Sequence, residues 1–236
     1  MSIEAQLAAA QSAIAELQRE VIRLKDIEAI RILQRTYSFC MDKGLYNEVI
    51  DLFAEEGELH FMGGIWKSRE SVRRLYCGRL RNLFTGGVNG PAYGMMVEHW
   101  PSQDVIHIEP GGLAAHGRWR CTLMGAVHDS KPDKPPHLPR QWWEHGIYEN
   151  EYVKRDGVWL IRKLAYSLFT ETPYEMGWAA AKPLPSPFFT KTVEEDPEGP
   201  DIISDAPFPS WPQTDLVPFH YAHPVTGKPI VPQKRG

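Results

Sequence analysis

The sequence predicts an α+β fold in which helices pack on one face of a curved antiparallel sheet. Helical patterns occupy the first part of the chain and long apolar strands the middle, an order typical of this class. Two long strands, within residues 141–169, are joined by Asp156-Gly157, which is a strong hairpin signal. The domain is expected to end near Phe169, and because 13 of the 20 prolines lie from Pro173 onward, little regular structure is expected there.

The N-terminal segment, residues 1–25, is expected to form a separate amphipathic helix with Ser2 as its N-cap. Its apolar residues recur at alternating spacings of four and three, which is the a/d pattern of a heptad repeat. They are Ile3, Leu7, Ala10, Ile14, Leu17, Val21 and Leu24. The pattern fits an oligomerisation helix, and it equally fits a helix that lies on its own domain.

Residues 26–170 are expected to form one domain. A second helix is predicted over 26–41, followed by a short helix, a strand near 58–62, and a helix that Ser68 caps and that runs to about Leu83. Pro101 is expected to break the next strand into two pieces. A long strand over 113–127 and the hairpin of 141–169 then flank a proline-rich loop.

Residues 171–236 combine many prolines with many aromatic side chains. A disordered linker is usually poor in aromatics, so we predict an ordered, extended arm that docks on the domain or on a neighbouring subunit. A disordered tail is the alternative. The aromatic residues are Tyr174, Trp178, Phe188, Phe189, Phe208, Trp211, Phe219 and Tyr221.

Composition excludes several classes of protein. The net charge of −4 and pI near 6.1 argue against a nucleic-acid partner. No apolar run approaches the roughly 20 residues of a membrane helix, and the N-terminus lacks the pattern of a signal peptide. The three cysteines, Cys40, Cys77 and Cys121, form no CxxC pair, which suits a reducing compartment. We therefore expect a cytoplasmic protein.

Four segments together resemble the SnoaL-like branch of the nuclear transport factor 2-like superfamily. They are "RTYSFCMDKGLYNEVIDLFAEEGELHF", "GIWKSRESVRRLY", "GLAAHGRWRCTL" and "GIYENEYVKRDGVWLIRKL", in the family's order. The resemblance covers about residues 26–169. It implies a cone-shaped α+β barrel whose curved sheet encloses a pocket that helices close. Members include dehydratases, isomerases, polyketide cyclases, non-catalytic dioxygenase subunits and transport adaptors, so the fold alone does not give the function.

The resemblance to dehydratases of this superfamily implies a catalytic site of Tyr37, Asp42 and His99. A histidine beside a carboxylate can act as a general acid or base, and a tyrosine hydroxyl can assist a leaving oxygen. On an ideal helix Tyr37 and Asp42 point about 140° apart, so Asp42 must turn inward where Gly44 ends the helix. Taken singly, Tyr37 could be a core residue and Asp42 a solvated one.

Further residues are candidates for binding a substrate. Strand alternation places His116 and Arg118 on one face, either lining the pocket or lying on a solvated outer face paired with acidic residues. Trp143, Tyr148 and Tyr166 of the hairpin would suit an aromatic ligand, or would simply be core. No HExxH pattern occurs, and we expect no metal and no cofactor.

The resemblance and these residues favour a cofactor-independent lyase acting on a bulky hydroxylated aromatic molecule. The long aromatic arm is similar to that of diarylpropane lyases from lignin-degrading bacteria, which would release formaldehyde and leave a stilbene through a quinone methide. A dehydratase or isomerase of a steroid-like or polyketide substrate is the alternative enzyme. A non-catalytic dioxygenase subunit would instead show scattered candidate residues and a filled pocket. A homo-oligomer, dimer or trimer, is expected.

Overall fold

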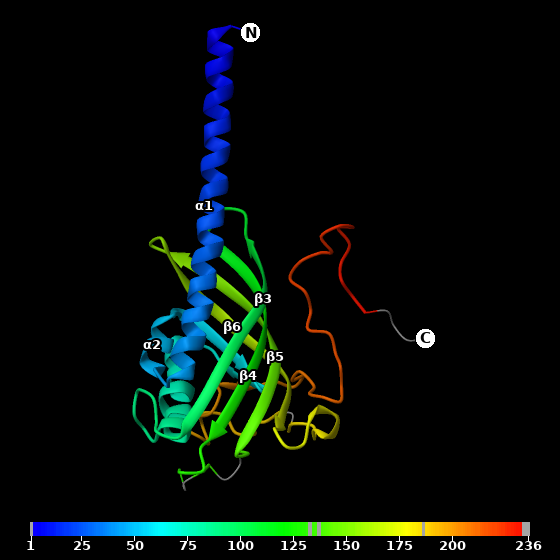
Figure 1. Cartoon of the computed structure of the whole chain (residues 1–236). Coiled ribbons are helices and arrows are strands. Elements are labelled where there is room, and N and C mark those ends of the chain that lie inside the picture. Colours follow the sequence, from blue (N-terminus) through cyan, green and yellow to red (C-terminus); the bar gives the residue numbers. More distant parts are fainter. Residues whose placement is uncertain (1, 132–133, 136–137, 186, 233–236) are drawn as a thin grey trace.

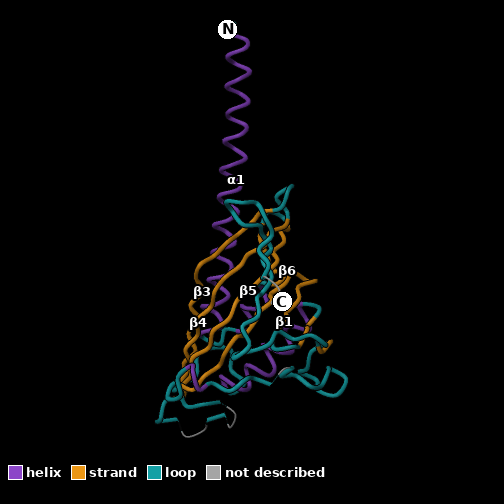
Figure 2. The backbone as a smooth tube through the Cα atoms, turned by 90° about the vertical axis from the view of Figure 1, so that its right-hand side faces the viewer, coloured by secondary structure: helices purple, strands orange, loops and turns teal. Residues whose placement is uncertain are grey.

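A curved seven-stranded sheet wraps around the end of a long helix in the computed structural model (Figures 1 and 2). The structure describes residues 2–131, 134–135, 138–185 and 187–232. The helices are α1 (Ile3–Asp42), α2 (Tyr46–Asp51), α3 (Arg69–Arg73), the π-helix η1 (Arg74–Thr85) and the short 3₁₀-helix η2 (Trp178–Ala180). The strands are β1 (Phe53–Phe61), β2 (Gly64–Trp66), β3 (Met95–Ile108), β4 (Ala114–Val127), β5 (Gln141–Arg155), β6 (Val158–Pro173) and β7 (Ile202–Ile203).

The sheet has the strand order β3-β4-β5-β6-β1-β2-β7 and does not close into a complete barrel. Neighbouring strands are antiparallel except for β1 and β6, which run parallel. The predicted α+β class, with helices on a curved and mostly antiparallel sheet, is confirmed. Because β1 comes from the N-terminal half and β6 from the hairpin, their parallel pairing joins the two halves of the domain.

Helix α1 is a single helix from Ile3 to Asp42, so the predicted separation into two helices near residue 25 is wrong. No glycine or proline occurs between these residues, and nothing in the local sequence ends the helix. The predicted N-cap is confirmed, because the Ser2 side chain accepts a hydrogen bond from the Ala5 N–H at 3.3 Å. The first six turns stand clear of the domain (Figures 1 and 2).

Strand β3 is continuous through Pro101, contrary to the predicted break. Strand β3 is the edge of the sheet, where a proline is tolerated because the missing N–H faces no partner strand. The irregularity lies just beyond it, as a register shift between Ser102 and Val105. Strand β1 begins at Phe53, five residues before the predicted start, and the predicted single helix after Ser68 changes to a π-helix at Arg74.

Buried polar contacts fasten the second half of α1 to the sheet. Asp26 accepts hydrogen bonds from Lys154 Nζ at 2.6 Å and from Trp159 Nε1 at 2.9 Å. About two turns further on, Gln34 Oε1 accepts from Asn150 Nδ2 and from the Tyr152 hydroxyl, each at 2.9 Å. A buried polar group must be paired to avoid a desolvation cost, so these contacts define how α1 lies on the sheet and hence where its last turns point.

The C-terminal arm packs against its own domain. Strand β7 pairs with β2, and Asp201 binds Arg74 at 2.5 Å. Phe189 is buried, with its ring in an edge contact 5.0 Å from that of Trp66. Further on, Phe219 lies against Arg118 of β4, with 3.9 Å between the guanidinium and the ring centre. Within the described residues, no helix is both long enough and apolar enough to cross a membrane.

Candidate active site

A cavity of about 910 Å³ lies between the helices and the inner face of the sheet. Its walls are mostly apolar, and α1, η1, β1 and β3 to β6 all contribute to them. The arm completes the cavity with Leu184, Pro185, Phe188 and Phe189, so the arm covers the pocket of its own chain. A volume at the upper end of the ordinary ligand range suits a bulky, apolar molecule.

His99 presents its imidazole to this cavity and is held from behind by Asp42. The Asp42 Oδ1 atom lies 2.7 Å from His99 Nδ1 and also accepts a hydrogen bond from the His99 backbone N–H at 2.8 Å. Both side chains are buried, at 3% exposure for Asp42 and 9% for His99. A carboxylate can only accept, so the neutral imidazole carries its proton on Nδ1 and leaves Nε2 as the basic atom.

Asp42 is the last residue of α1 and points toward β3 rather than into the cavity. The predicted inward turn of Asp42 beside Tyr37 is therefore wrong, as the offset between these two positions on a regular helix would lead one to expect. Tyr37 lines the cavity, and Asp42 reaches it only through His99. A carboxylate at a helix C-terminus is unfavourable on its own, and the two hydrogen bonds from His99 offset this cost.

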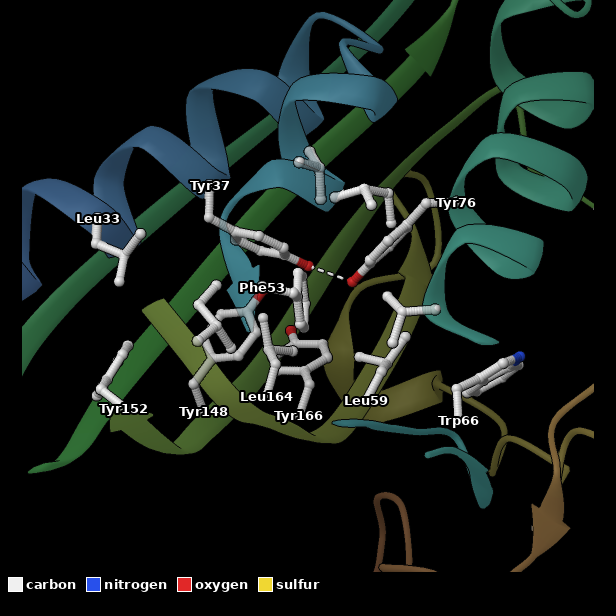
Figure 3. Close-up of a cluster of buried hydrophobic side chains, with 14 of the residues drawn as sticks. Leu33, Tyr37, Phe53, Leu59, Trp66, Tyr76, Tyr148, Tyr152, Leu164 and Tyr166 are labelled. Carbon is white, nitrogen blue, oxygen red and sulfur yellow. Dashed lines mark hydrogen bonds between the residues drawn. The ribbon is translucent and has the colours of Figure 1, made fainter. Parts of the chain in front are cut away.

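Four tyrosines gather around the middle of the cavity (Figure 3). The hydroxyls of Tyr37 and Tyr76 lie 2.7 Å apart, close enough for a hydrogen bond. The rings of Tyr148 and Tyr166 stack with their centres 4.4 Å apart. Burial raises the pKa of Tyr37, of Tyr148 and of Tyr166 well above the ordinary phenol value. All of these phenols are therefore neutral hydrogen-bond donors at neutral pH.

Two glutamates also line the cavity, on the inner face of the hairpin. Glu144 of β5 and Glu171 of β6 are direct cross-strand partners. Burial, with the repulsion between the two carboxylates, raises the pKa of Glu144 to about 8, and burial also raises the pKa of Glu171. The pair thus retains a proton at neutral pH.

The structure does not bring three of the predicted binding residues to the cavity. His116 and Arg118 lie on the outer face of β4, where His116 Nε2 is 3.2 Å from Glu109 and Arg118 binds Glu149 and the Pro218 carbonyl. Trp143 lies on the outer face of β5 beside Trp100. The inner positions of β4 belong to Trp119, Cys121 and Leu123, so the alternation of the strand excludes His116 and Arg118.

Residues 22–165 match the model of the SnoaL-like domain, which is more than half of the chain. The chain belongs to the SnoaL-like family. No curated protein matches it by sequence.

Solved structures share the SnoaL-like fold at low identity. A provisionally assigned scytalone dehydratase from Novosphingobium aromaticivorans superimposes with a TM-score of 0.53 and 19% identity, covering 70% of this chain and 97% of that one. A type 2 hexachlorocyclohexane dehydrochlorinase superimposes with a TM-score of 0.52 and 19% identity, and the match covers 65% of this chain and 92% of that one. A type 3 form of that enzyme from Novosphingobium barchaimii has a TM-score of 0.51 and 18% identity, and the match covers 65% of this chain and 93% of that one. At these identities the likeness concerns the fold.

In this SnoaL-like domain, three polar cavity residues that are able to transfer or share protons were not predicted from the sequence. Tyr76 lies on the π-helix, whose turn differs from the 3.6-residue period used to assign faces. Glu144 and Glu171 lie at alternate positions of strands that already carried more prominent aromatic residues. Alternation from Tyr148 places Glu144 on the same face as that tyrosine, so the signal was present in the sequence.

The arrangement of the SnoaL-like cavity suits acid–base chemistry on a mainly apolar ligand. His99 Nε2 is available to move a proton, and the Tyr37–Tyr76 pair can donate to an oxygen of the ligand. Among the described residues there is no group of three or more histidine, cysteine, aspartate or glutamate side chains arranged to hold a metal ion.

Proposed function

We propose that this protein is a lyase that eliminates water, formaldehyde, or both from a bulky hydroxylated aromatic molecule without a cofactor. The observation that carries the proposal is the buried Asp42–His99 pair, whose imidazole faces a large apolar cavity. Such an elimination neither oxidises nor reduces the substrate, so proton transfer and stabilisation of a leaving oxygen are sufficient. The dehydratase and dehydrochlorinase names of the structural neighbours are consistent with elimination chemistry.

A lignin-derived diarylpropane diol with a para-phenol is the substrate that fits best. In the first step, protonated His99 gives its Nε2 proton to the benzylic hydroxyl, which leaves as water. The Tyr37–Tyr76 hydroxyls lie beside the same cavity and donate to the departing oxygen. The phenol loses its proton at the same time, and its electrons form a quinone methide.

In the second step, His99, now neutral, accepts the proton of the terminal hydroxyl. That oxygen forms a carbonyl, the carbon–carbon bond breaks, and formaldehyde leaves. The released electron pair forms the new double bond and restores the aromatic ring, which takes a proton back on its phenolic oxygen. The products are a stilbene, water and formaldehyde, and His99 is again protonated. Asp42 holds the ring throughout, with Nδ1 bonded to its carboxylate.

The open cavity supports an enzyme over a non-catalytic dioxygenase subunit, because that alternative requires a filled pocket and scattered residues. A dehydratase or isomerase of a steroid-like or polyketide substrate would use the same groups. We infer a diarylpropane because the polar groups of the otherwise apolar cavity lie in two places, His99 on β3 and the glutamates on β5 and β6. This separation suits a molecule with two separated rings.

The test is turnover of a panel of diarylpropane diols by the purified protein without any added cofactor. We expect stilbene absorbance and formaldehyde to appear together in equal amounts from para-phenolic diols. The para-methyl ethers of the same diols are the matched control, because they cannot form a quinone methide. Dehydration of steroid-like or polyketide alcohols with no reaction of the diols would contradict the substrate assignment and favour the alternative.

A further inference from the structure

Glu144, Glu171 and Tyr166 form a polar cluster on the cavity wall that the elimination scheme above leaves without a role. All three line the cavity, and the two carboxyls are paired across β5 and β6. Two carboxylates side by side in a buried place are costly, and a purely structural wall would be built from apolar residues. The cluster therefore calls for a ligand group.

The Tyr166 hydroxyl is a second sign of a ligand at this place. The residue is only 7% exposed, and its hydroxyl makes no hydrogen bond of ordinary length and angle among the described residues, although it lies near enough to the Glu144 carboxyl to interact with it. A buried polar atom without a partner costs about 1–3 kcal/mol. Its ring lies beside that of Tyr148 (Figure 3), and both residues line the cavity, so a ligand oxygen could supply the missing partner.

The sheet register gives the distance of this cluster from His99. His99 pairs with Leu123, Leu123 pairs with Glu144, and Glu144 pairs with Glu171, so the four form one row across β3 to β6. Neighbouring strands are about 4.8 Å apart, which puts the backbone of Glu144 roughly 10 Å from that of His99. A ligand in the cavity can touch both ends when its polar groups are separated by about one aromatic ring.

We propose that Glu144, Glu171 and Tyr166 form a subsite that binds the para-phenol of the substrate and holds its proton while the quinone methide exists. This inference rests on the proposed lyase function. The ionised carboxyl of the pair accepts the phenolic proton as the benzylic C–O bond breaks at the other end. The same proton returns to the phenolic oxygen when the carbon–carbon bond breaks and the ring becomes aromatic again. The pair begins and ends each cycle with one proton.

The same subsite excludes anionic groups. A ligand carboxylate placed here would face the negative charge of the Glu144–Glu171 pair. Arg79, the guanidinium among the described residues that line the cavity, binds Asp196 of the arm, and His99 lies at the other end of the row. Like charges within a buried site repel strongly. The preferred substrates are therefore neutral phenols rather than aromatic acids.

Equilibrium binding of product-like stilbenes tests the subsite without any need for turnover. The probes are 4-hydroxystilbene, 4-methoxystilbene and stilbene-4-carboxylate, followed by fluorescence. We expect the wild type to bind the phenol at least about 10-fold more tightly than the ether, the gain of one good hydrogen bond, and to reject the carboxylate. The Glu144→Gln/Glu171→Gln variant should lose this preference and admit the carboxylate.

Glu109→Gln is the control, because Glu109 lies on the outer face beside His116. It should bind all three probes as the wild type does, and thermal unfolding should show that the double variant is folded. Equal affinities of wild type and double variant for the phenol, the ether and the carboxylate would overturn the subsite. Because no turnover is measured, a correct subsite in a protein that does not cleave diols would leave the binding pattern intact.

The free half of α1 carries a second inference, which is independent of the reaction. Its heptad stripe is exposed along its whole length, with Leu17 at 66% and Leu24 at 52% exposure. A single helix of this length gains little stability without packing of its apolar face. The stripe does not lie on the domain, which excludes the second interpretation of the N-terminal sequence pattern.

The direction of the stripe shows which partner fits. At 100° per residue, its centre lies roughly opposite the face of α1 that the domain buries, the side of Ile30 and Tyr37. A two-fold axis along the stripe would therefore place the two domains on opposite outer sides of a helix pair, with no collision between them. The same outward side continues along the domain with Ile32 and Phe39, at 56% and 70% exposure.

We infer that a second copy of this chain covers the stripe, in a parallel two-stranded coiled coil. The heptad places Ile14 and Val21 at a positions and Leu17 and Leu24 at d positions, the combination that favours parallel dimers. Glu20 then falls at g and Lys25 at e, so each Glu20 meets the Lys25 of the other chain with opposite charge. Within one chain Glu20 makes only an exposed pair with Arg23.

Cysteine cross-linking of the full chain tests both the contact and its direction. In the parallel dimer the Ala10 side chains of the two chains face each other at a d position, so Ala10→Cys should form a disulfide-linked dimer on mild oxidation. Ala9→Cys, one position away on the outer side, is the matched control and should not. An antiparallel pair would place Ala10 opposite an a-position residue of the other chain, and Ala10→Cys would then fail to cross-link.

The mass in solution completes this test. Wild type should sediment as a dimer, and Leu17→Glu, which places a charge in the seam, should raise the dimer dissociation constant by at least about 100-fold. A wild-type monomer, a trimer, or a dimer unaffected by Leu17→Glu would overturn the inference. The domain should stay folded in every variant, because Leu17 makes no part of its core.

Discussion

Replacing His99 by glutamine is expected to lower kcat for diol cleavage by about 10²–10⁴-fold, the usual contribution of a positioned general acid–base group. Glutamine preserves much of the volume and polarity but cannot take up and return a proton near neutral pH. The His99 imidazole is the titratable ring that faces the cavity from β3, and Asp42 holds it in place. The measurement is the initial rate of stilbene formation under saturating substrate.

A matched control for this variant is His145→Gln, at a position on the outer face of the same sheet, next to Trp178. It should cleave the diols at the wild-type rate. Thermal unfolding should show that both variants are folded, since neither change touches the main core. A His99→Gln variant that kept the wild-type rate would contradict the assignment of His99 as the proton-transfer group, whatever the substrate.

Changing Asp42 to asparagine is expected to lower kcat by about 10²-fold with little change in KM. The asparagine Oδ1 can still accept from the His99 backbone N–H and from Nδ1, so the ring stays in place. What is lost is the charge-assisted hydrogen bond from Nδ1 to a carboxylate, which is stronger than one to a neutral amide oxygen. Asp42→Ala removes the acceptor of both hydrogen bonds and should also cost about 1–3 kcal/mol of folding free energy, because a buried N–H is left unpaired.

Asp51→Asn is the control for this pair of variants. Asp51 is likewise the last residue of a helix, α2, but it is exposed. Its replacement should leave the rate unchanged. The double variant His99→Gln/Asp42→Asn should be no slower than His99→Gln alone, because the rate losses of residues that act as one unit do not add. Additive losses would show that Asp42 acts on the substrate by a route that does not pass through His99.

Much of the site could be predicted because its chemistry depends on short sequence signals. The resemblance to dehydratases of the superfamily assigned Tyr37, near a helix end, and His99, near the start of a strand, and the structure places both at one cavity. The pairing of Asp42 with His99 joins residues 57 positions apart. What could not be predicted was that Asp42 lies behind the histidine, since this depends on the angle at which α1 crosses β3.

The binding residues show where strand patterns fail. Alternation correctly put His116 and Arg118 on one face of β4, but it could not say which face is the inner one. In the structure the face with Trp119 and Cys121 packs in the core, and the arm covers Arg118 on the outer side with Phe219 and the carbonyls of residues 217 and 218. Glu144 was overlooked because a lone acidic residue within an aromatic strand is more often solvated.

The sequence by itself determined the class of fold, the heptad of the first helix, the hairpin at Asp156-Gly157 and the residue types available for acid–base work. These are local properties, set by spacing, turn chemistry and helix caps. Only the tertiary structure decided that the arm closes its own pocket and that Glu144, Glu171 and His99 share one row of the sheet. The physical reason is that register and crossing angle depend on packing between distant segments, which no local pattern encodes.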